Sequence, residues 1–205
     1  MEINSTKINT FIFDCFGVIC GSAFFSWYKE NMLKYGNTDS KLLEVFKEHD
    51  LGRFPEEDVA EYFSKYEGID ATKEKILEDF NNYLNIDQRL VDTILKLREK
   101  GFKIALISNG HHLYFEDRVY VKYPEFKNLF DEIIVSSLVG TVKPDKEIYL
   151  HALSKINSKP EESLFIDDSQ VNIDGAKNVG IQGFLYTDVD SFIEYIKSLG
   201  IDLEK

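Results

Sequence analysis

The sequence predicts an α/β protein with a doubly wound parallel sheet, into which a helical segment is inserted. Five short apolar runs alternate with amphipathic stretches along most of the chain. The runs are continuously apolar, which is typical of parallel strands that are buried on both faces. A helical pattern of roughly sixty residues separates the first run from the second, and a single strand-to-strand crossover needs far fewer.

Each predicted strand stops at a polar or turn-forming residue. The five strands are expected over residues 10–13, 102–107, 132–135, 164–166 and 183–186. Asp14 follows the first strand, Ser108 follows the second, and the pair Asp167-Asp168 follows the fourth. Since parallel strands end at one edge of a sheet, we expect these polar side chains to share that edge.

Amphipathic helices are predicted between the strands. Apolar residues recur at helical spacing over residues 88–100, 145–156, 172–179 and 190–199. Gly101, Gly180 and Gly200 follow three of these segments, and a glycine commonly ends a helix. This alternation of strands and helices indicates right-handed crossovers and a sheet covered by helices on both faces.

The inserted segment is expected to be a helical bundle. Helical patterns cover residues 24–34, 40–49, 56–66 and 72–84. Pro55 marks the start of the third helix. An insertion just after the first strand lies over the carboxyl edge of the sheet, where open α/β sheets bind ligands. We therefore interpret residues 21–85 as a helical cap domain, and residues 1–20 together with 86–205 as the α/β core domain.

Composition and charge exclude several classes of protein. The 205 residues carry a net charge of −12, and an acidic surface repels nucleic-acid phosphates. No apolar stretch reaches the ~18–20 residues of a membrane span, and residues 1–10 lack the apolar core of a secretory signal. Cys15 and Cys20 are too few for a disulfide framework and are expected to be reduced packing residues. We expect a cytoplasmic protein that binds neither nucleic acid nor membrane, and its oligomeric state stays open.

Taken singly, most polar residues at the predicted edge have ordinary explanations. Asp14 could cap a helix, Ser108-Asn109 could form a turn, and Lys143 could be a solvated surface residue. The pair Asp167-Asp168 differs, because adjacent carboxylates at a buried strand end repel each other unless a cation neutralises them. A hard divalent cation such as Mg²⁺ suits oxygen ligands of this kind.

In this order the motifs resemble those of the haloacid dehalogenase superfamily. They are the run 11–14 that ends in Asp14, Ser108-Asn109, Lys143-Pro144, and Asp167-Asp168 followed by Asn172, Gly175-Ala176 and Gly180. The insertion is similar to the C1-type helical cap of subfamily I, and residues 52–57 resemble a loop often found in such caps. The resemblance covers nearly the whole chain. It implies a Rossmann-like core and places the sugar-phosphate phosphatases among the similar members.

The resemblance implies a phosphatase reaction. Asp14 would attack phosphorus and form an aspartyl-phosphate intermediate. Ser108 and Asn109, with the amides that follow, would bind the phosphoryl oxygens. Lys143 would bind the phosphate and neutralise both Asp14 and the transferring group. The implied substrate is a small phosphorylated metabolite, since a cap that closes over the site excludes larger partners.

The resemblance also implies a magnesium site at the same edge. Its ligands would be Asp14, the backbone carbonyl of Phe16, and Asp168, with Asp167 as a closer or water-mediated partner. The metal would allow an anionic nucleophile to approach an anionic phosphate.

Phe16 departs from the pattern of the family. Most phosphatases of the superfamily carry at this position a second aspartate, which protonates the leaving group. A phenyl ring transfers no proton, so the about 10²–10⁴-fold acceleration from general acid–base catalysis must come from elsewhere or be lost. Esters with good leaving groups are then expected to react best. His111 and His112 are expected to be exposed loop residues, with a substitute acid or base as the alternative.

Two alternatives to a phosphatase stay open. The 2-haloacid dehalogenase branch also lacks the second aspartate and has a lysine followed six residues later by a tyrosine, as Lys143 and Tyr149 are here. That branch needs no metal and uses a cap arginine, for which the insertion offers only Arg53. The other alternative is a catalytically weak phosphate-binding protein. The aromatic residues within 24–28 are expected to pack the bundle, with a substrate pocket as the alternative.

Overall fold

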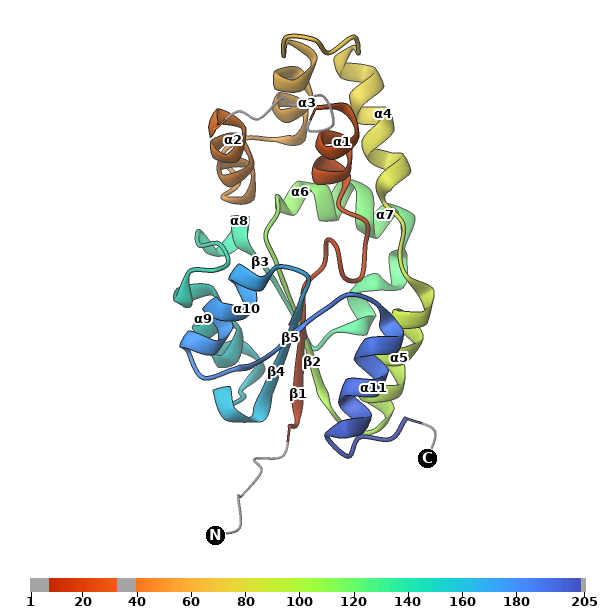
Figure 1. Ribbon diagram of the computed structural model, residues 1–205, viewed down its shortest axis with the longest axis vertical. Helices are drawn as coiled ribbons and strands as arrows, with labels where there is room; N and C mark the ends of the chain where they lie inside the picture. The colour runs from red at the N-terminus through yellow and green to blue at the C-terminus, as the bar shows by residue number, and fades with distance from the viewer. Residues whose placement is uncertain (1–7, 33–39, 204–205) are drawn as a thin grey trace.

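The computed structural model describes residues 8–32 and 40–203, and its centre is a five-stranded parallel sheet (Figure 1). The strands are β1 (Thr10–Phe13), β2 (Lys103–Ser108), β3 (Glu132–Val135), β4 (Ser163–Asp167) and β5 (Gln182–Leu185). Their spatial order is β3-β2-β1-β4-β5, and every neighbouring pair is parallel. The predicted fold class is confirmed. The strand order reverses between β1 and β4, which places the ligand-binding edge beside the end of β1.

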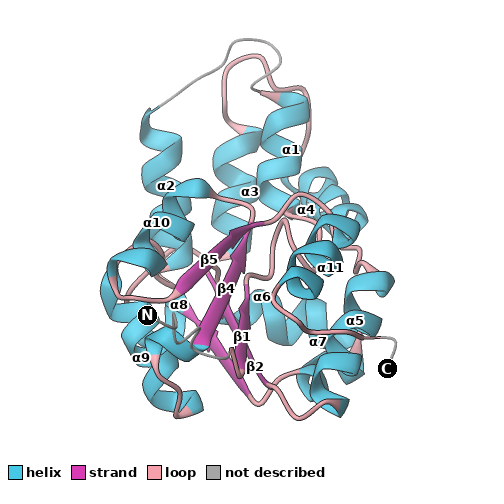
Figure 2. Ribbon diagram, turned by 60° about the horizontal axis from the view of Figure 1, so that its bottom comes forward, coloured by secondary structure: helices cyan, strands magenta, loops and turns pink. Residues whose placement is uncertain are grey.

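Helices cover both faces of the sheet, as Figures 1 and 2 show. One face carries α9 (Lys146–Ile156) and α10 (Gln170–Asn178), and the other carries α5 (Gln88–Glu99) and α11 (Val189–Ser198). Successive residues of β1 point to opposite faces and are all buried, which explains why the strand sequence is continuously apolar. No helix among the described residues is both long enough and apolar enough to cross a lipid bilayer.

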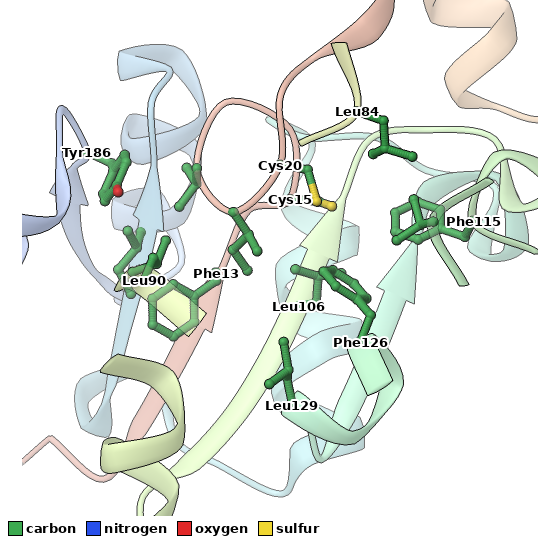
Figure 3. Packing of buried hydrophobic residues seen from close by; sticks show 14 of the residues in the cluster. Phe13, Cys15, Cys20, Leu84, Leu90, Leu106, Phe115, Phe126, Leu129 and Tyr186 are labelled. Carbon is green, nitrogen blue, oxygen red and sulfur yellow. The ribbon is translucent and has the colours of Figure 1, made fainter. Parts of the chain in front are cut away.

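The larger of the two cores lies under α5 and α11 and extends to the carboxyl edge. Figure 3 shows Phe13 of β1, Leu90 of α5 and Leu106 of β2 on this side. Cys15 and Cys20 are both buried and unpaired, in agreement with the expected packing role. The loop that follows β1 is therefore anchored in the core by these two side chains, which restricts the positions of its polar groups.

Residues 112–129 form short helical turns to which the sequence pattern assigns nothing. They are α6 (His112–Tyr114), a π-helical turn η2 (Phe115–Val119), α7 (Tyr120–Lys122) and a 3₁₀ turn η3 (Pro124–Leu129). Changes between α, π and 3₁₀ geometry interrupt the regular spacing of apolar residues, so no single period is visible. Phe115 and Phe126 are buried and join this segment to the larger core (Figure 3).

In its described residues, the inserted segment contains four helices that lie beyond the carboxyl ends of the strands (Figures 1 and 2). They are α1 (Ala23–Asn31), α2 (Ser40–Asp50), α3 (Glu56–Ser64) and α4 (Lys73–Tyr83). The first helix is shorter than predicted, and the predicted positions 33 and 34 lie outside the described residues, as do residues 1–7. Trp27 stacks on Phe63 with ring centroids 4.9 Å apart. The division into a core and a cap domain stays a prediction.

The chain enters and leaves the insertion through two adjacent segments. The amide of Gly21 donates a hydrogen bond to the carbonyl of Asn85 (3.0 Å), and the amide of Asp87 donates to the carbonyl of Ile19 (3.0 Å). Cys20 and Ile86 form an antiparallel bridge between these two bonds. The insertion thus begins and ends at one point beside the carboxyl edge.

Arg118 of the π-helical turn fastens this turn to two helices of the insertion. Its Nε donates to Glu56 of α3 (3.1 Å), and its guanidinium also donates to Asn81 of α4 (2.8 Å). The Glu56 side chain is 11% exposed, and its Oε1 has no hydrogen-bond partner among the described residues. Burial raises the pKa of Glu56, although Arg118 lowers it. The pair therefore consists of a desolvated carboxylate that depends on one arginine.

Replacement of Arg118 by methionine is expected to lower the free energy of unfolding by about 2 kcal/mol, because Glu56 then loses its counter-ion. Arg89→Met is the matched control, since Arg89 pairs with Asp190 on the surface, and a much smaller change is expected there. Urea denaturation measures both variants. Equal losses for the two arginines would contradict the importance of the buried pair.

Candidate active site

A cavity of about 390 Å³ lies between the carboxyl edge of the sheet and the helices of the insertion. Asp14, Asn109, Lys143 and Asp168 line it from the sheet side. Aromatic side chains and the end of α2 line it from the side of the insertion, namely Phe24, Phe25, Phe46, His49 and Asp50. One wall is therefore charged and the other is largely apolar.

A buried lysine joins two of the carboxylates that end the strands. The Nζ of Lys143 lies 2.6 Å from Oδ1 of Asp14 and 2.7 Å from Oδ2 of Asp167. The three side chains are 1%, 8% and 0% exposed. Burial raises the pKa of Asp14 to about 7, even though Lys143 lowers it. Burial lowers the pKa of Lys143, but the two carboxylates outweigh it, so this pKa lies above its usual value and the lysine stays charged.

Asn109 holds the backbone of Lys143 through two reciprocal hydrogen bonds. Its Nδ2 donates to the carbonyl of Lys143 (3.0 Å), and the amide of Lys143 donates to its Oδ1 (2.8 Å). Gly175 of α10 packs against the next residue, and a Cβ at this position would approach the carbonyl oxygen of Pro144 to 2.7 Å. The Asn109 side chain is thus occupied in positioning the lysine. Its predicted contact with phosphate stays a prediction.

Ser108 lies at the end of β2 as predicted, but it is fully buried and does not line the cavity. Its Oγ donates to the carbonyl of Asn109 (3.3 Å). The neighbouring amide of Gly110 donates to Oγ of Ser136 (2.9 Å). The Ser108 hydroxyl is thus occupied by the backbone of the next residue, and its predicted contact with phosphate stays a prediction.

The oxygens of Asp167 are saturated by donors within the protein. Besides Lys143, the Nδ2 of Asn172 lies 3.0 and 3.1 Å from its two oxygens, and the amide of Ser169 donates at 2.8 Å. The Tyr149 hydroxyl in turn donates to the carbonyl of Asn172 (2.8 Å). Asp167 lies beneath Lys143 as its counter-ion, while Asp168 reaches the cavity.

Asp14, Asp167 and Asp168 form a group that can hold a metal ion. One carboxylate oxygen from each lies within 4.8 Å of the others. Burial raises the pKa of Asp168, and the negative charge of Asp167 raises it further. The raised pKa thus reflects, in part, repulsion between neighbouring carboxylates. Gly17 has φ +96°, and a Cβ at this position would overlap the carboxylate of Asp168. A group of three carboxylates, one of them closely approached by the bare backbone of Gly17, fits a hard cation with oxygen ligands.

The ring of Phe16 packs against aromatic neighbours on the floor of the cavity. Its centroid lies 5.5 Å from those of both Tyr114 and Phe115. The side chain thus continues the hydrophobic core up to the cavity and offers no proton at the position where the resemblance expects an aspartate.

His111 is buried, and the expectation of an exposed loop residue is wrong for it. Its Nδ1 accepts a hydrogen bond from the amide of Leu113 (3.2 Å), so the ring caps the short helix α6. Its ring lies 4.8 Å from that of His112. Burial and this neighbour lower the pKa of His111. The capping contact explains the burial, and the sequence pattern did not indicate it.

The aromatic cluster of α1 is divided between the two expected roles. Trp27 is buried in the bundle, whereas Phe24 and Phe25 line the cavity. Asp50 and His49 also line the cavity, and no motif pointed to either of them. Arg53 lies on the surface and pairs with Glu48.

Comparisons with known proteins agree with this architecture. The family model of the haloacid dehalogenase-like hydrolases matches residues 8–180. A sesquiterpene phosphatase of Aspergillus oryzae is 32% identical over 105 residues, which are 51% of this chain and 53% of that protein. The flavin mononucleotide hydrolase 1 of Arabidopsis thaliana is 26% identical over 96% of this chain and 80% of its own length. The chain spans about half the length of the first of these relatives.

A solved structure shares the fold along nearly the whole chain. The HAD family enzyme BT-2542 of Bacteroides thetaiotaomicron superimposes with a TM-score of 0.68 and 21% identity. The match covers 90% of this chain and 98% of that one, whose structure contains magnesium and inorganic phosphate.

Lys143→Met is expected to lower the free energy of unfolding by about 3–5 kcal/mol at about pH 8, because two buried carboxylates lose their counter-ion. The pKa of Asp14, already about 7, then rises further above the ~3.9 of an unfolded aspartate. A raised pKa penalises the ionised form, so the loss grows as the pH rises and is smaller at about pH 5. Urea denaturation at both pH values measures this, with exposed Lys146→Met as control. A loss that is independent of pH would contradict the pairing.

Proposed function

Because the chain belongs to the family of haloacid dehalogenase-like hydrolases, we propose that it hydrolyses small phosphomonoesters through an aspartyl-phosphate intermediate on Asp14. The observation that carries the proposal is the contact of Asp14 with Lys143 at the floor of the cavity. Such a lysine lowers the pKa of the nucleophile against the effect of burial and stabilises the negative charge of a transferring phosphoryl group.

The hydrogen bonds of Asp14 indicate which of its oxygens attacks. Oδ1 accepts from the amide of Cys15 (2.6 Å) and faces Nζ of Lys143. Oδ2 accepts no hydrogen bond from any described residue, so its electron pairs are free for phosphorus. Two donors on Oδ1 also fix the rotation of the carboxylate, which reduces the entropy lost when the reacting atoms align.

The carboxylate group fits Mg²⁺ as the cofactor. Asp14, Asp168 and the backbone carbonyl of Phe16 would hold it, with Asp167 behind them in contact with Lys143. When bound, the ion would screen the negative charge of nucleophile and phosphate from each other. The magnesium and phosphate in the structure of the BT-2542 enzyme support this assignment.

The walls of the cavity suggest the type of substrate. Charge is concentrated at the sheet edge, where a phosphate would lie, and Phe24, Phe25 and Phe46 face the space for the rest of the molecule. An ester with an apolar or aromatic portion would bury more surface there than a sugar phosphate. Among the relatives, the sesquiterpene phosphatase and the flavin mononucleotide hydrolase are named for substrates that have such a portion.

The geometry favours phosphate over a haloacid. Tyr149 donates its hydroxyl to Asn172 and packs under the sheet, and Arg53 is 64% exposed beside Glu48. Neither faces the cavity, although the dehalogenase alternative relies on both.

Asp14→Asn is expected to abolish magnesium-dependent release of phosphate from aryl phosphates, with a fall of at least about 10³-fold, because the amide is no nucleophile. Asp174→Asn, which removes an exposed acid from α10, is the control and should keep full activity. Phosphate and chloride release are measured with and without Mg²⁺. Chloride release from 2-chloropropionate without metal would establish a dehalogenase instead, and neither activity would favour a binding protein.

Gly17→Ala is expected to raise the magnesium concentration needed for half-maximal activity by about tenfold or more, since the added methyl group displaces Asp168. Gly101→Ala is the matched control, because Gly101 also has a positive φ but its Cβ would meet open space. Magnesium titrations of both variants separate the contact with Asp168 from backbone strain. Equal effects of the two substitutions would argue against Asp168 as a ligand.

A further inference from the structure

The proposed reaction lacks a proton donor on the sheet side of the cavity. Phe16 has none to give, and Asp168 belongs to the group of carboxylates that can hold a metal. The Tyr114 hydroxyl is buried without a partner among the described residues. Burial, followed by the charge of Glu56, raises its pKa far above the usual value. Tyr114 therefore keeps its proton and cannot alternate between acid and base.

The histidines that line the cavity are also unsuited to deliver a proton. Nδ1 of His49 donates to the carbonyl of Phe54 (2.8 Å), and burial lowers the pKa of His49 to about 4. Nδ1 of His111 is occupied by the amide of Leu113, and burial lowers its pKa as well. Both rings are neutral near pH 7 and cannot act as acids there.

We propose that Asp50, the last residue of α2, is the catalytic acid and base of this site, in the role that position 16 leaves open. Asp50 lines the same cavity as Asp14 and Lys143, from the opposite wall. Its carboxylate accepts no hydrogen bond from any described residue. This inference rests on the proposed function and adds the residue that protonates the leaving group.

The end of α2 is tied directly to the catalytic edge. The Oγ of Ser136, at the start of α8 (Ser136–Val139), donates to the carbonyl of Asp50 (2.5 Å) and accepts from the amide of Gly110 (2.9 Å). Gly52 packs so closely on α8 that a Cβ there would approach Cβ of Ser137 to 2.9 Å. The backbone that carries the Asp50 side chain is thus held beside the catalytic edge, which limits where this side chain can lie.

The surroundings of Asp50 bring the pKa of its carboxyl group close to neutral pH. Burial raises its pKa to about 7, although the ammonium of Lys143 lowers it. The charged and titratable groups that share the cavity with it are Asp14, Lys143 and Asp168 from the core, His111 and Tyr114 from the segment after β2, and His49 on its own helix. A carboxyl group with such a pKa is partly protonated at neutral pH and can donate a proton in one step and accept one in the next.

The protons balance over the two steps. Oδ2 of Asp14 forms a bond to phosphorus while the bond from phosphorus to the ester oxygen breaks, and this oxygen takes the proton of Asp50 and leaves as an alcohol. Ionised Asp50 then takes a proton from water, whose oxygen attacks phosphorus. The bond from phosphorus to Asp14 breaks, which releases inorganic phosphate and restores both carboxyl groups to their starting states.

The test compares leaving groups in the full-length protein with Mg²⁺. Asp50→Asn is expected to lower kcat/KM for an alkyl phosphate by about 10²–10⁴-fold, because an alkoxide needs a proton to leave. The loss for para-nitrophenyl phosphate, whose phenolate leaves unaided, is expected to be about tenfold or less. Asp50→Glu should recover part of the alkyl activity. Glu44→Gln removes an exposed acid from the same helix and should change neither rate.

Two further measurements distinguish an acid from a structural residue. With the alkyl ester, kcat/KM of the wild-type protein should fall above about pH 7, and this fall should vanish in Asp50→Asn. The pKa of Asp50 lies above the ~3.9 of an unfolded aspartate, so its ionised form destabilises the fold as the pH rises from about 4 to about 7. The thermal midpoint of Asp50→Asn should therefore rise at about pH 8 and stay unchanged at about pH 4.

The outcomes separate this inference from the proposed function. Equal losses for the two esters, or an alkaline decline that persists in Asp50→Asn, would show that Asp50 is not the acid while phosphatase activity stands. If the wild-type protein hydrolyses neither ester, the proposed function fails and the role of Asp50 fails with it. Asp50→Ser, measured alongside, shows whether any loss follows the carboxyl group or the asparagine amide.

Discussion

The architecture of the site depends on one buried cation between two buried anions. Asp14 directly follows the central strand and Asp167 ends its neighbour, so both carboxylates lose water at the edge of the sheet. Lys143 compensates for this desolvation, and it does so because Asn109 holds its backbone from the end of β2. The contact therefore couples three strands that are remote in the sequence. Without it, neither carboxylate could be ionised in the fold at low cost.

The two walls of the cavity divide the chemistry between the sheet and the insertion. The sheet edge concentrates charge around Asp14, where the amide of Cys15 and the buried lysine restrict the carboxylate. The insertion contributes aromatic surface and the carboxyl group of Asp50. The phosphate group, which all phosphoesters share, would thus contact the rigid sheet edge. The rest of the substrate would contact the insertion, whose side chains can change without disrupting the sheet.

The sequence predicted the structure best where burial imposes a regular pattern of apolar residues or where a polar residue marks the end of a strand. Strands buried on both faces are continuously apolar, and the parallel arrangement brings Asp14 and Asp167 to one edge. Residues 112–129 gave no such pattern, because their turns change geometry every few residues. The direction of a side chain within a loop was equally hidden, as the Ser108 hydroxyl and the Asn109 amide show. Asp50 could not be found either, since its place depends on the path of the insertion over the sheet and not on a local motif.

The paired crossings at Cys20 and Ile86 bring the two ends of the insertion together. Because its two ends are already hydrogen-bonded to each other, exchanging everything between them leaves the closure entropy of the core nearly the same. A graft of a different bundle at this junction would leave the contact of Asp14 with Lys143 in place. Such a junction would allow substrate specificity to change by exchange of the whole inserted segment, and not only by single substitutions.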